Sequence, residues 1–239
     1  MLQRTLTPGE AMSPPGIKEK YWLPFEGAHR SGAWDALNAC YCEPHRAYHG
    51  WGHIAALLER LYALQYLATW ADIIAIAAFW HDAVYTTSDS GGRPRPDYEN
   101  VRDSARLFRR YTLLKPPAGD AVSSLIMATA DHLNARPDVQ FYEGFEADLD
   151  LFLDLDLSSL ASGWEAFEAH MIQIRSEFSF VSDAEFYASH LRTLHNFARD
   201  DVALFRRPET RALWQSAARA NLKRCCAELS KKLAACSLA

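Results

Sequence analysis

The sequence has few of the features that mark a nucleic-acid-binding or membrane-spanning protein. Lys and Arg number 25 against 30 Asp and Glu, so the formal net charge is −5 and no basic excess is present to attract a nucleic acid polymer or an anionic membrane. The longest apolar run, residues 67–80, is interrupted by Asp72 and is too short to cross a bilayer. Residues 1–16 lack the positive start and apolar middle of a signal peptide. We therefore expect a cytoplasmic protein that has neither nucleic acid nor membrane as a partner.

Cysteine pairing and β-strand patterns are also scarce. The five cysteines form an odd number without the paired spacing of a zinc site, which predicts free thiols in a reducing compartment. Period-two alternation occurs in one segment, residues 148–157, where Leu occupies every odd position from 149 to 157. The same residues also place an apolar stripe on a helix, and a strand here would have no partner elsewhere in the chain. We therefore predict a helix at this position and an all-α fold.

Turn signals divide the rest of the chain into long helical blocks. Gly and Pro predict a loop over residues 88–96. A chain of 239 residues is long enough for one sizeable core, so residues 21–239 are expected to form a single helical domain after an N-terminal tail of residues 1–20. We expect helices over residues 33–42, 52–67, 71–82, 97–111, 120–132 and 164–181, then a helix capped by Ser182 or Asp183 and a final helix after Pro208.

Three segments place metal-binding residue types where the chain is otherwise apolar, and the first is residues 46–53. His49 and His53 are four positions apart and would share one face of a helix. Gly50 and Gly52 weaken any helix between them. A single histidine at a helix start is usually a capping or core residue, so neither histidine alone indicates a site. His53 is the stronger candidate because it begins the apolar helix.

The second segment is the pair His81-Asp82, which directly follows the apolar residues 73–80. Adjacent helical residues point about 100° apart, so both side chains can still reach one ion between them. An ionised carboxylate at the end of so apolar a helix needs a counter-charge, and a divalent cation supplies one. The alternative is that Asp82 accepts hydrogen bonds at a helix end.

In the third segment, residues 148–157, geometry chooses among the carboxylates if the segment is helical. Asp154 and Asp156 then lie about 200° apart, and the apolar stripe passes through position 156. Asp156 is therefore predicted to face inward, and Asp148, Asp150 and Asp154 are expected on a solvated face. In a strand, all four aspartates would share one face and this choice would fail.

Two histidines, the aspartate beside one of them and a distant inward aspartate make a mixed nitrogen and oxygen donor set. Such a set suits Fe, Mn, Zn, Co or Ni better than Ca. Fewer than six protein ligands leave positions for water and substrate, and a metal can lower the pKa of water to about 7. The set is therefore typical of metal-assisted hydrolysis.

The ordered motifs resemble the HD-domain superfamily of metal-dependent phosphohydrolases, and in particular a bacterial branch described as predicted metal-dependent HD phosphohydrolases. The match runs from Arg46 to Leu222 and covers most of the chain. The Arg-x-Tyr-His-x-x-x-His motif is present as Arg46, Tyr48, His49 and His53, and the Phe-x-His-Asp-x-x-Tyr centre as Phe79, His81, Asp82 and Tyr85. Later motifs are matched by Asn100, Ser104 and Ala105; by Ile126, Thr129 and His132; by Phe152, Asp154, Asp156 and Leu157; by Arg175, Glu177 and Phe178; and by Ala218, Arg219, Asn221 and Leu222.

The resemblance implies an HD-type helical bundle, one or two divalent transition-metal ions, and a small phosphate ester, such as a nucleotide, as substrate. It implies that the metal ligands are His53, His81, Asp82 and Asp156, with His81 and Asp82 as the catalytic pair. The residues implied for substrate binding are Arg46, Tyr48, His49, Asn100, His132 and Arg175.

Several of these residues have a second interpretation. His49 and His132 could hold a second metal ion, and His132 could instead be a hydrogen-bonded residue at a helix end. Arginine suits phosphate because a guanidinium matches its geometry bidentately. Arg175 could equally form an ordinary salt bridge with Glu177 or Glu168.

One motif departs from the branch, and the departure bears on activity. Where Glu is expected after Asn100, this chain has Val101; if that Glu activates water, Glu99 could replace it. For Asn100 and Tyr48, structural hydrogen bonding is the alternative to substrate binding. Three functions remain open, in this order: a phosphohydrolase, a di-iron oxygenase that uses additional histidines, and a nucleotide-sensing or interaction module with little catalysis.

Overall fold

The computed structural model describes residues 16–236, and within this range it contains helices, two isolated β-bridges and no strand. The protein is therefore all-α, as predicted. In chain order, with η marking short 3₁₀ or π-helices, the elements are η1 (Lys18–Trp22), η2 (Leu23–Ala28), α1 (Ala33–Tyr41), α2 (Trp51–Leu64), η3 (Gln65–Leu67), α3 (Ala71–Trp80), α4 (Asp97–Tyr111), α5 (Ala118–Ala128), η4 (Thr129–Asp131), α6 (Phe145–Leu157), η5 (Ser158–Ala161), α7 (Trp164–Glu177), α8 (Asp183–Ala198) and α9 (Pro208–Cys236).

Several helices form where the sequence predicts them. Every residue from 73 to 80 of α3 is buried, as expected of a helix that is apolar on all sides. The helix α4 covers the predicted residues 97–111. Ser182 caps α8: its hydroxyl accepts the backbone N–H of Glu185, and the Glu185 carboxylate accepts the backbone N–H of Ser182. Local sequence signals therefore suffice to place these elements.

Other helix ends differ from the prediction. The helix predicted over residues 52–67 is divided into α2, which ends at Leu64, and the 3₁₀ turn η3. The helix α5 covers residues 118–128 before η4 rather than 120–132. The helix α7 ends at Glu177 rather than at residue 181. The guanidinium of Arg175 stabilises this end by donating hydrogen bonds to the carbonyl groups of Phe178 and Val181.

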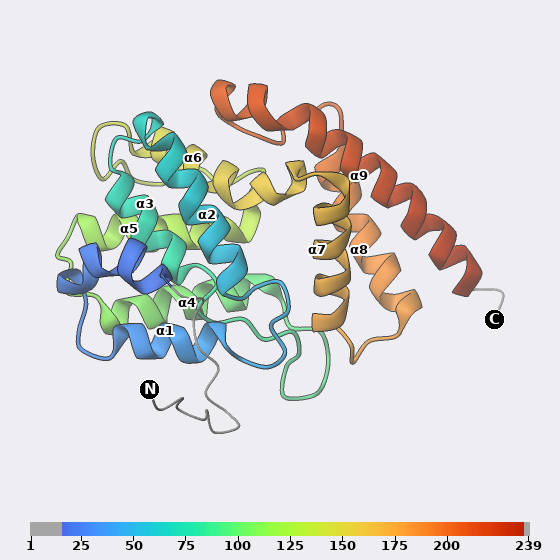
Figure 1. Ribbon diagram of the computed structural model, residues 1–239, viewed down its shortest axis with the longest axis horizontal. Helices are drawn as coiled ribbons and strands as arrows, with labels where there is room; N and C mark the ends of the chain where they lie inside the picture. The colour runs from blue at the N-terminus through green and yellow to red at the C-terminus, as the bar shows by residue number, and fades with distance from the viewer. Residues whose placement is uncertain (1–15, 237–239) are drawn as a thin grey trace, which may run out of the picture.

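Two hydrophobic clusters organise the chain. The first surrounds α3 and takes buried side chains from α1, α2, α4, α5 and α6. The second joins η5 to α7, α8 and α9, which lie together beside the first bundle (Figure 1). The helix α6 leads from one cluster to the other, because its apolar residues between 149 and 155 belong to the first and Leu157 to the second. Trp214 of α9 packs against both.

The aspartates of α6 contradict the prediction of a solvated face. Asp148 is 0% exposed and Asp154 is 1% exposed, because α6 lies between the two clusters and its apolar residues are buried on all sides. Asp148 accepts the backbone N–H groups of Thr69 and Trp70, just before α3, at 2.7 and 2.8 Å. Asp154 accepts the backbone N–H groups of Arg206 and Arg207, just before α9. Of the three aspartates expected on a solvated face, only Asp150 keeps partial exposure.

The remaining predictions concern the tail, the membrane and the cysteines. Residues 1–15 of the predicted tail lie outside the described range, and Ile17 is buried. No helix of residues 16–236 combines the length and apolar character needed to cross a lipid bilayer. The five cysteines all fall within this range, and each is a free thiol, as predicted.

Candidate metal centre

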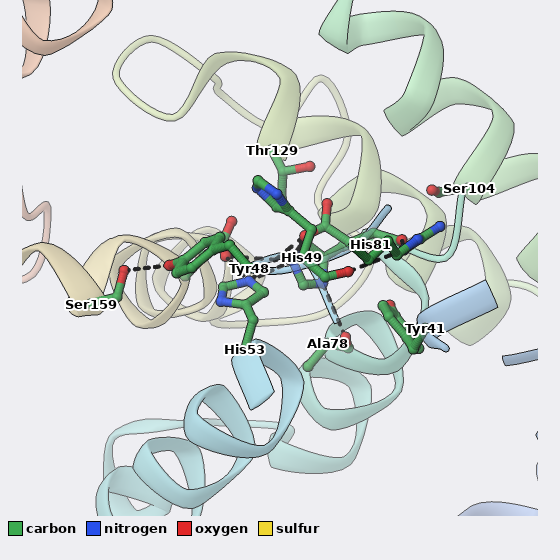
Figure 2. A network of polar contacts seen from close by, with 12 residues as sticks. Tyr41, Tyr48, His49, His53, Ala78, His81, Ser104, Thr129 and Ser159 are labelled. Carbon is green, nitrogen blue, oxygen red and sulfur yellow. Dashed lines mark hydrogen bonds and ion pairs between the residues drawn. The ribbon is translucent and has the colours of Figure 1, made fainter. Parts of the chain in front are cut away.

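Two histidines from neighbouring helices turn their Nε2 atoms toward each other. His53 lies in the first turn of α2 and His81 directly follows α3. Their Nε2 atoms are 3.3 Å apart, and the rings face a common space in Figure 2. The Nδ1–H of His81 donates to the carbonyl of Ala78 at 3.0 Å, which leaves its Nε2 to face the centre. An imidazole held in this way is typical of a metal ligand.

Two carboxylates approach the same atoms. Oδ2 of Asp82 lies 3.2 Å from the His81 Nε2 and 3.7 Å from the His53 Nε2. Asp156, from α6, places Oδ1 2.9 Å from the His53 Nε2 and 3.4 Å from the His81 Nε2. The side chain of Asp156 is 10% exposed, so its predicted inward orientation is confirmed. The four residues predicted as ligands therefore meet at one point, and Asp154 lies elsewhere.

The electrostatics of the cluster reflect its two buried carboxylates. Burial alone lowers the pKa of His81, but the charges of Asp82 and Asp156 outweigh it and hold the pKa well above its ordinary value. Burial alone raises the pKa of both carboxyl groups, but the positive charge of His81 outweighs it and lowers both. Each shift has the same cause: carboxylates removed from water need a positive charge between them.

His53, His81 and Asp82 form a cluster that could hold a metal ion, because one donor atom of each lies within 4.8 Å of the others. The donors fit a cation chemically. Both histidines present Nε2, and a carboxylate oxygen of Asp156 adjoins them. A divalent cation would supply the positive charge that a proton on His81 otherwise provides. This nitrogen and oxygen set suits a transition metal.

His132 extends the centre on the far side of Asp156. It follows η4, and its Nε2 lies 2.7 Å from Oδ2 of Asp156. The other oxygen, Oδ1, faces His53 and His81. One carboxylate therefore contacts histidines with both of its oxygens.

Glu177, the last residue of α7, is a site residue that the sequence reasoning did not assign. Its side chain is fully buried. Oε1 accepts the backbone N–H groups of Tyr48 and His49 at 2.7 and 2.9 Å, and Oε2 accepts the ring Nδ1–H of His49 at 2.6 Å. The His49 ring also stacks on Tyr85 with centroids 4.0 Å apart. Glu177 thus fixes the His49 ring through a hydrogen bond to its Nδ1. In the sequence, the Arg-x-Glu motif was the only signal that marked Glu177.

We expect Glu177→Gln to lower the pKa of His49. Burial is the largest influence and lowers this pKa, but the hydrogen bond that His49 donates to Glu177 and the charge of Asp82 raise it above the ordinary value. Glutamine keeps the shape and removes the charge. An NMR titration of the His49 imidazole should therefore move to lower pH in Glu177→Gln. It should stay in place in Glu168→Gln, which changes an exposed acid on the same helix. An unchanged titration in Glu177→Gln would contradict this account.

The two arginines expected to bind phosphate are engaged elsewhere. The Arg46 side chain is 1% exposed. It donates to the carboxylate of Glu43 and to the carbonyl groups of His49, Asp82 and Ala83. Its guanidinium therefore joins the segment before α2 to the residues after α3, behind the centre, and does not line the cavity.

Arg175 has a comparable structural position. Its Nε and Nη2 bind Asp183 at 2.9 and 2.6 Å, and its remaining donors bind the carbonyl groups beyond α7. The salt bridge is thus formed with Asp183, and not with Glu177 or Glu168 as the alternative interpretation had it. The prediction of two guanidinium clamps finds no support in these contacts.

His53, Asp82 and Asp156 line a cavity of about 360 Å³. Tyr48 and Asn100 line it, but both are hydrogen-bonded to protein. The Tyr48 hydroxyl lies 2.7 Å from Ser159 Oγ (Figure 2), and the Asn100 side-chain amide binds the backbone N–H and carbonyl of Thr86. Both residues therefore shape the cavity wall through contacts of their own.

Position 101, where the HD branch has Glu, has an aspartate close to it in the cavity wall. Val101 is buried in the lining. Glu99, the predicted replacement, is paired with Arg95 at 3.3 Å and is not among the lining residues. Asp97 lies one helical turn before Val101 on α4 and does line the cavity. The acid available to a ligand here is therefore Asp97.

No family model, no curated protein and no solved structure matches this chain.

Proposed function

We propose that this protein is a metal-dependent phosphohydrolase of the HD type that acts on a small phosphate ester. The observation that carries the proposal is the meeting of His53, His81, Asp82 and Asp156, three of which line a cavity, although the chain separates the first and the last by about 100 residues. Two buried carboxylates facing two Nε2 atoms are difficult to explain by stability alone, because their desolvation opposes folding.

The proposed cofactor is a divalent transition metal such as Fe, Mn, Zn, Co or Ni, held by these four side chains. When bound, such an ion lowers the pKa of water to about 7 and supplies hydroxide at neutral pH. The hydrogen bond from His81 to Ala78 orients its ring, and the position of Asp82 beside both histidines sets the charge of the site.

The charge count supports His49 as the residue that contacts the phosphate. The carboxylates of Asp82 and Asp156 already balance one divalent ion, so an anionic substrate needs further positive charge. His49 lines the cavity, and its raised pKa favours the charged form. Because Glu177 holds Nδ1, the charged ring would donate from Nε2 to a phosphate oxygen.

A second candidate function, a di-iron oxygenase, is favoured by the contacts of Asp156. Its two oxygens face histidines on opposite sides, which is how a carboxylate shared by two ions would be placed. His132, and His49 farther along the cavity, could complete a second site. Two irons per chain and oxygen consumption with an organophosphonate would select this function over hydrolysis.

Asp97 is proposed as the acid–base group in the absence of Glu at position 101. The cavity walls raise its pKa by desolvation and the charge of Asp82 raises it further, while His49 and His132 act in the opposite direction. Positioned acids and bases contribute about 10²–10⁴-fold to rates. We expect Asp97→Asn to lower kcat by about 100-fold and Glu99→Gln to leave it within about twofold. The reverse order, measured by phosphate release, would assign the role to Glu99.

The proposed function is tested by phosphate release from a panel of phosphomonoesters. Protein stripped with a chelator is reconstituted with Mn²⁺, Co²⁺, Ni²⁺, Fe²⁺ or Zn²⁺ and mixed with nucleoside monophosphates and alkyl and aryl phosphates. The proposal predicts orthophosphate release with at least one ion and none in the presence of chelator. Release from no ester by any metal-loaded form would overturn it.

A further inference from the structure

The cavity is chemically divided between its two sides. Every aspartate or arginine in its described lining comes from the first bundle: Asp82 after α3, Arg95 just before α4, Asp97 at the start of α4, and Asp156 on α6. The other side is formed by the second hydrophobic cluster and contributes no Asp, Glu, Lys or Arg among the lining residues of the described range. A ligand would therefore meet charge at one end only.

The second side is made of apolar side chains from four successive elements, α6, η5, α7 and α8. These side chains are Leu157, Leu160, Met171, Ile174, Leu194 and Phe197. Leu194 is buried, whereas Ile174 and Phe197 remain partly exposed toward the cavity. An apolar part of a ligand that packs against these side chains would be removed from contact with water.

The one titratable group on this side is also uncharged. His190 packs against Met171, with its Nε2 3.4 Å from Sδ, and both residues line the cavity. Burial lowers the pKa of His190 to about 4, so the ring is neutral at pH 7. His190 therefore adds a weak polar contact and no charge to the apolar side.

The cavity also lacks a free cation for a second phosphate group. Arg95 is the only lysine or arginine among the described lining residues, and its guanidinium is bound to Glu99, Asp103 and Asn100. A nucleoside diphosphate or triphosphate would bring several negative charges to a site with no unengaged guanidinium or ammonium group. A single phosphate group at the metal end fits the charges better.

The cavity volume leaves room for an organic group. A six-coordinate ion held by four side chains keeps about two water molecules, which occupy roughly 60 Å³ at about 30 Å³ for each. The cavity measures about 360 Å³. Most of the space therefore remains for the phosphate group and the alcohol part of an ester.

We propose that the substrate is a phosphomonoester whose alcohol is an uncharged alkyl or aryl group, with the phosphate at the His53–Asp82 end and the organic group against α7 and α8. This inference rests on the proposed phosphohydrolase function and narrows its substrate class. It assigns Ile174, Leu194 and Phe197 to substrate selection. It disfavours polyphosphorylated nucleotides, because the charged part of the cavity accommodates one phosphate group and the other part carries no charge.

The test is the binding of n-alkylphosphonates, from methylphosphonate to hexylphosphonate, to the Mn²⁺-loaded protein by calorimetry. Phosphonates are not hydrolysed as esters, so the readout does not depend on turnover. We expect the affinity to rise about two- to fourfold for each added methylene group until the apolar side is filled. A terminal carboxylate, as in 6-phosphonohexanoate, should weaken binding at least about tenfold relative to hexylphosphonate, because that charge would lose its water.

Two variants on α7 distinguish an effect of the cavity lining from an effect of the exposed surface. Ile174→Ala should weaken hexylphosphonate at least about threefold and leave methylphosphonate unchanged. Ile172→Ala, which removes an isoleucine that is 65% exposed and outside this cavity, should change neither. Equal affinity along the series, or no binding of any phosphonate, would overturn the substrate class. Chain-length dependence without phosphate release from any ester would instead overturn hydrolysis and leave the apolar ligand site standing.

Discussion

Asp82→Asn is expected to abolish metal binding and the proposed phosphohydrolase activity together. Asp82 is the one carboxylate that sits beside His81 in the chain, and its Oδ2 approaches both His81 and His53. Asparagine preserves the size of the side chain but removes the negative charge that attracts a cation. Loss of an outer partner of a metal ligand already costs about 10–100-fold in affinity, so loss of a ligand charge should cost at least about 100-fold. Hydrolysis should fall by at least about 10³-fold.

Asp72→Asn is the matched control for this change. Asp72 lies in the first turn of the same helix, α3, and is exposed. Metal content after chelation, reloading and desalting is measured by elemental analysis, and activity by phosphate release. The control should retain both properties. Equal metal content in Asp82→Asn and in the unaltered protein would show that Asp82 is not a ligand.

Asp154→Ala should produce the largest loss of stability of any aspartate change on α6. The carboxylate is 1% exposed and accepts the backbone N–H groups of Arg206 and Arg207 at 2.7 and 2.9 Å, as well as the hydroxyl of Thr210. Alanine would leave the two backbone N–H groups without their partner next to the start of α9, in a buried site that water does not readily enter, whereas the Thr210 hydroxyl keeps the carbonyl of Arg207. Each unsatisfied buried donor costs about 1–3 kcal/mol, so we expect a loss of about 3–5 kcal/mol.

The measurement is chemical denaturation at pH 8, with Asp150→Ala for comparison. Burial raises the pKa of Asp154 to about 6, so at pH 8 its carboxylate is charged in the folded protein. Asp150, one turn earlier, is partly exposed and forms a single salt bridge with Arg206 at 2.9 Å. Its removal should cost about 1 kcal/mol or less. Similar losses in the two variants would contradict the capping role of Asp154.

The sequence predicts the helices whose signals are local. The apolar residues of α3 have no other low-energy arrangement than burial on all sides, and the cap at Ser182 satisfies its own helix end. The inward orientation of Asp156 also follows from helix geometry, because the apolar stripe passes through its position. These features depend on residues within one or two turns of each other.

The sequence cannot supply contacts that join distant segments. The partners of Asp148 and Asp154 are backbone N–H groups at residues 69–70 and 206–207, so their burial is invisible to the periodicity of α6. The periodicity therefore predicts, wrongly, that Asp148 and Asp154 face solvent. In both cases the interior accepts the carboxylate because a helix start provides donors for it.

The same limit applies to the charged residues around the metal centre. Arg46 is buried by carbonyl groups that follow α3, and Glu177 reaches His49 across more than 100 residues of sequence. A motif can mark such residues as important without showing whether they bind a ligand or hold another residue that does. Here both hold the segment of Tyr48 and His49 in place, Arg46 from behind and Glu177 from α7.

The most direct test of the account is the position of a bound ion. Crystals of the protein loaded with Zn²⁺ would be measured at the zinc absorption edge. The account predicts an anomalous peak about 2.0–2.2 Å from Nε2 of His53, Nε2 of His81 and carboxylate oxygens of Asp82 and Asp156. A zinc peak bound only elsewhere, or none among these four side chains at a saturating zinc concentration, would contradict it.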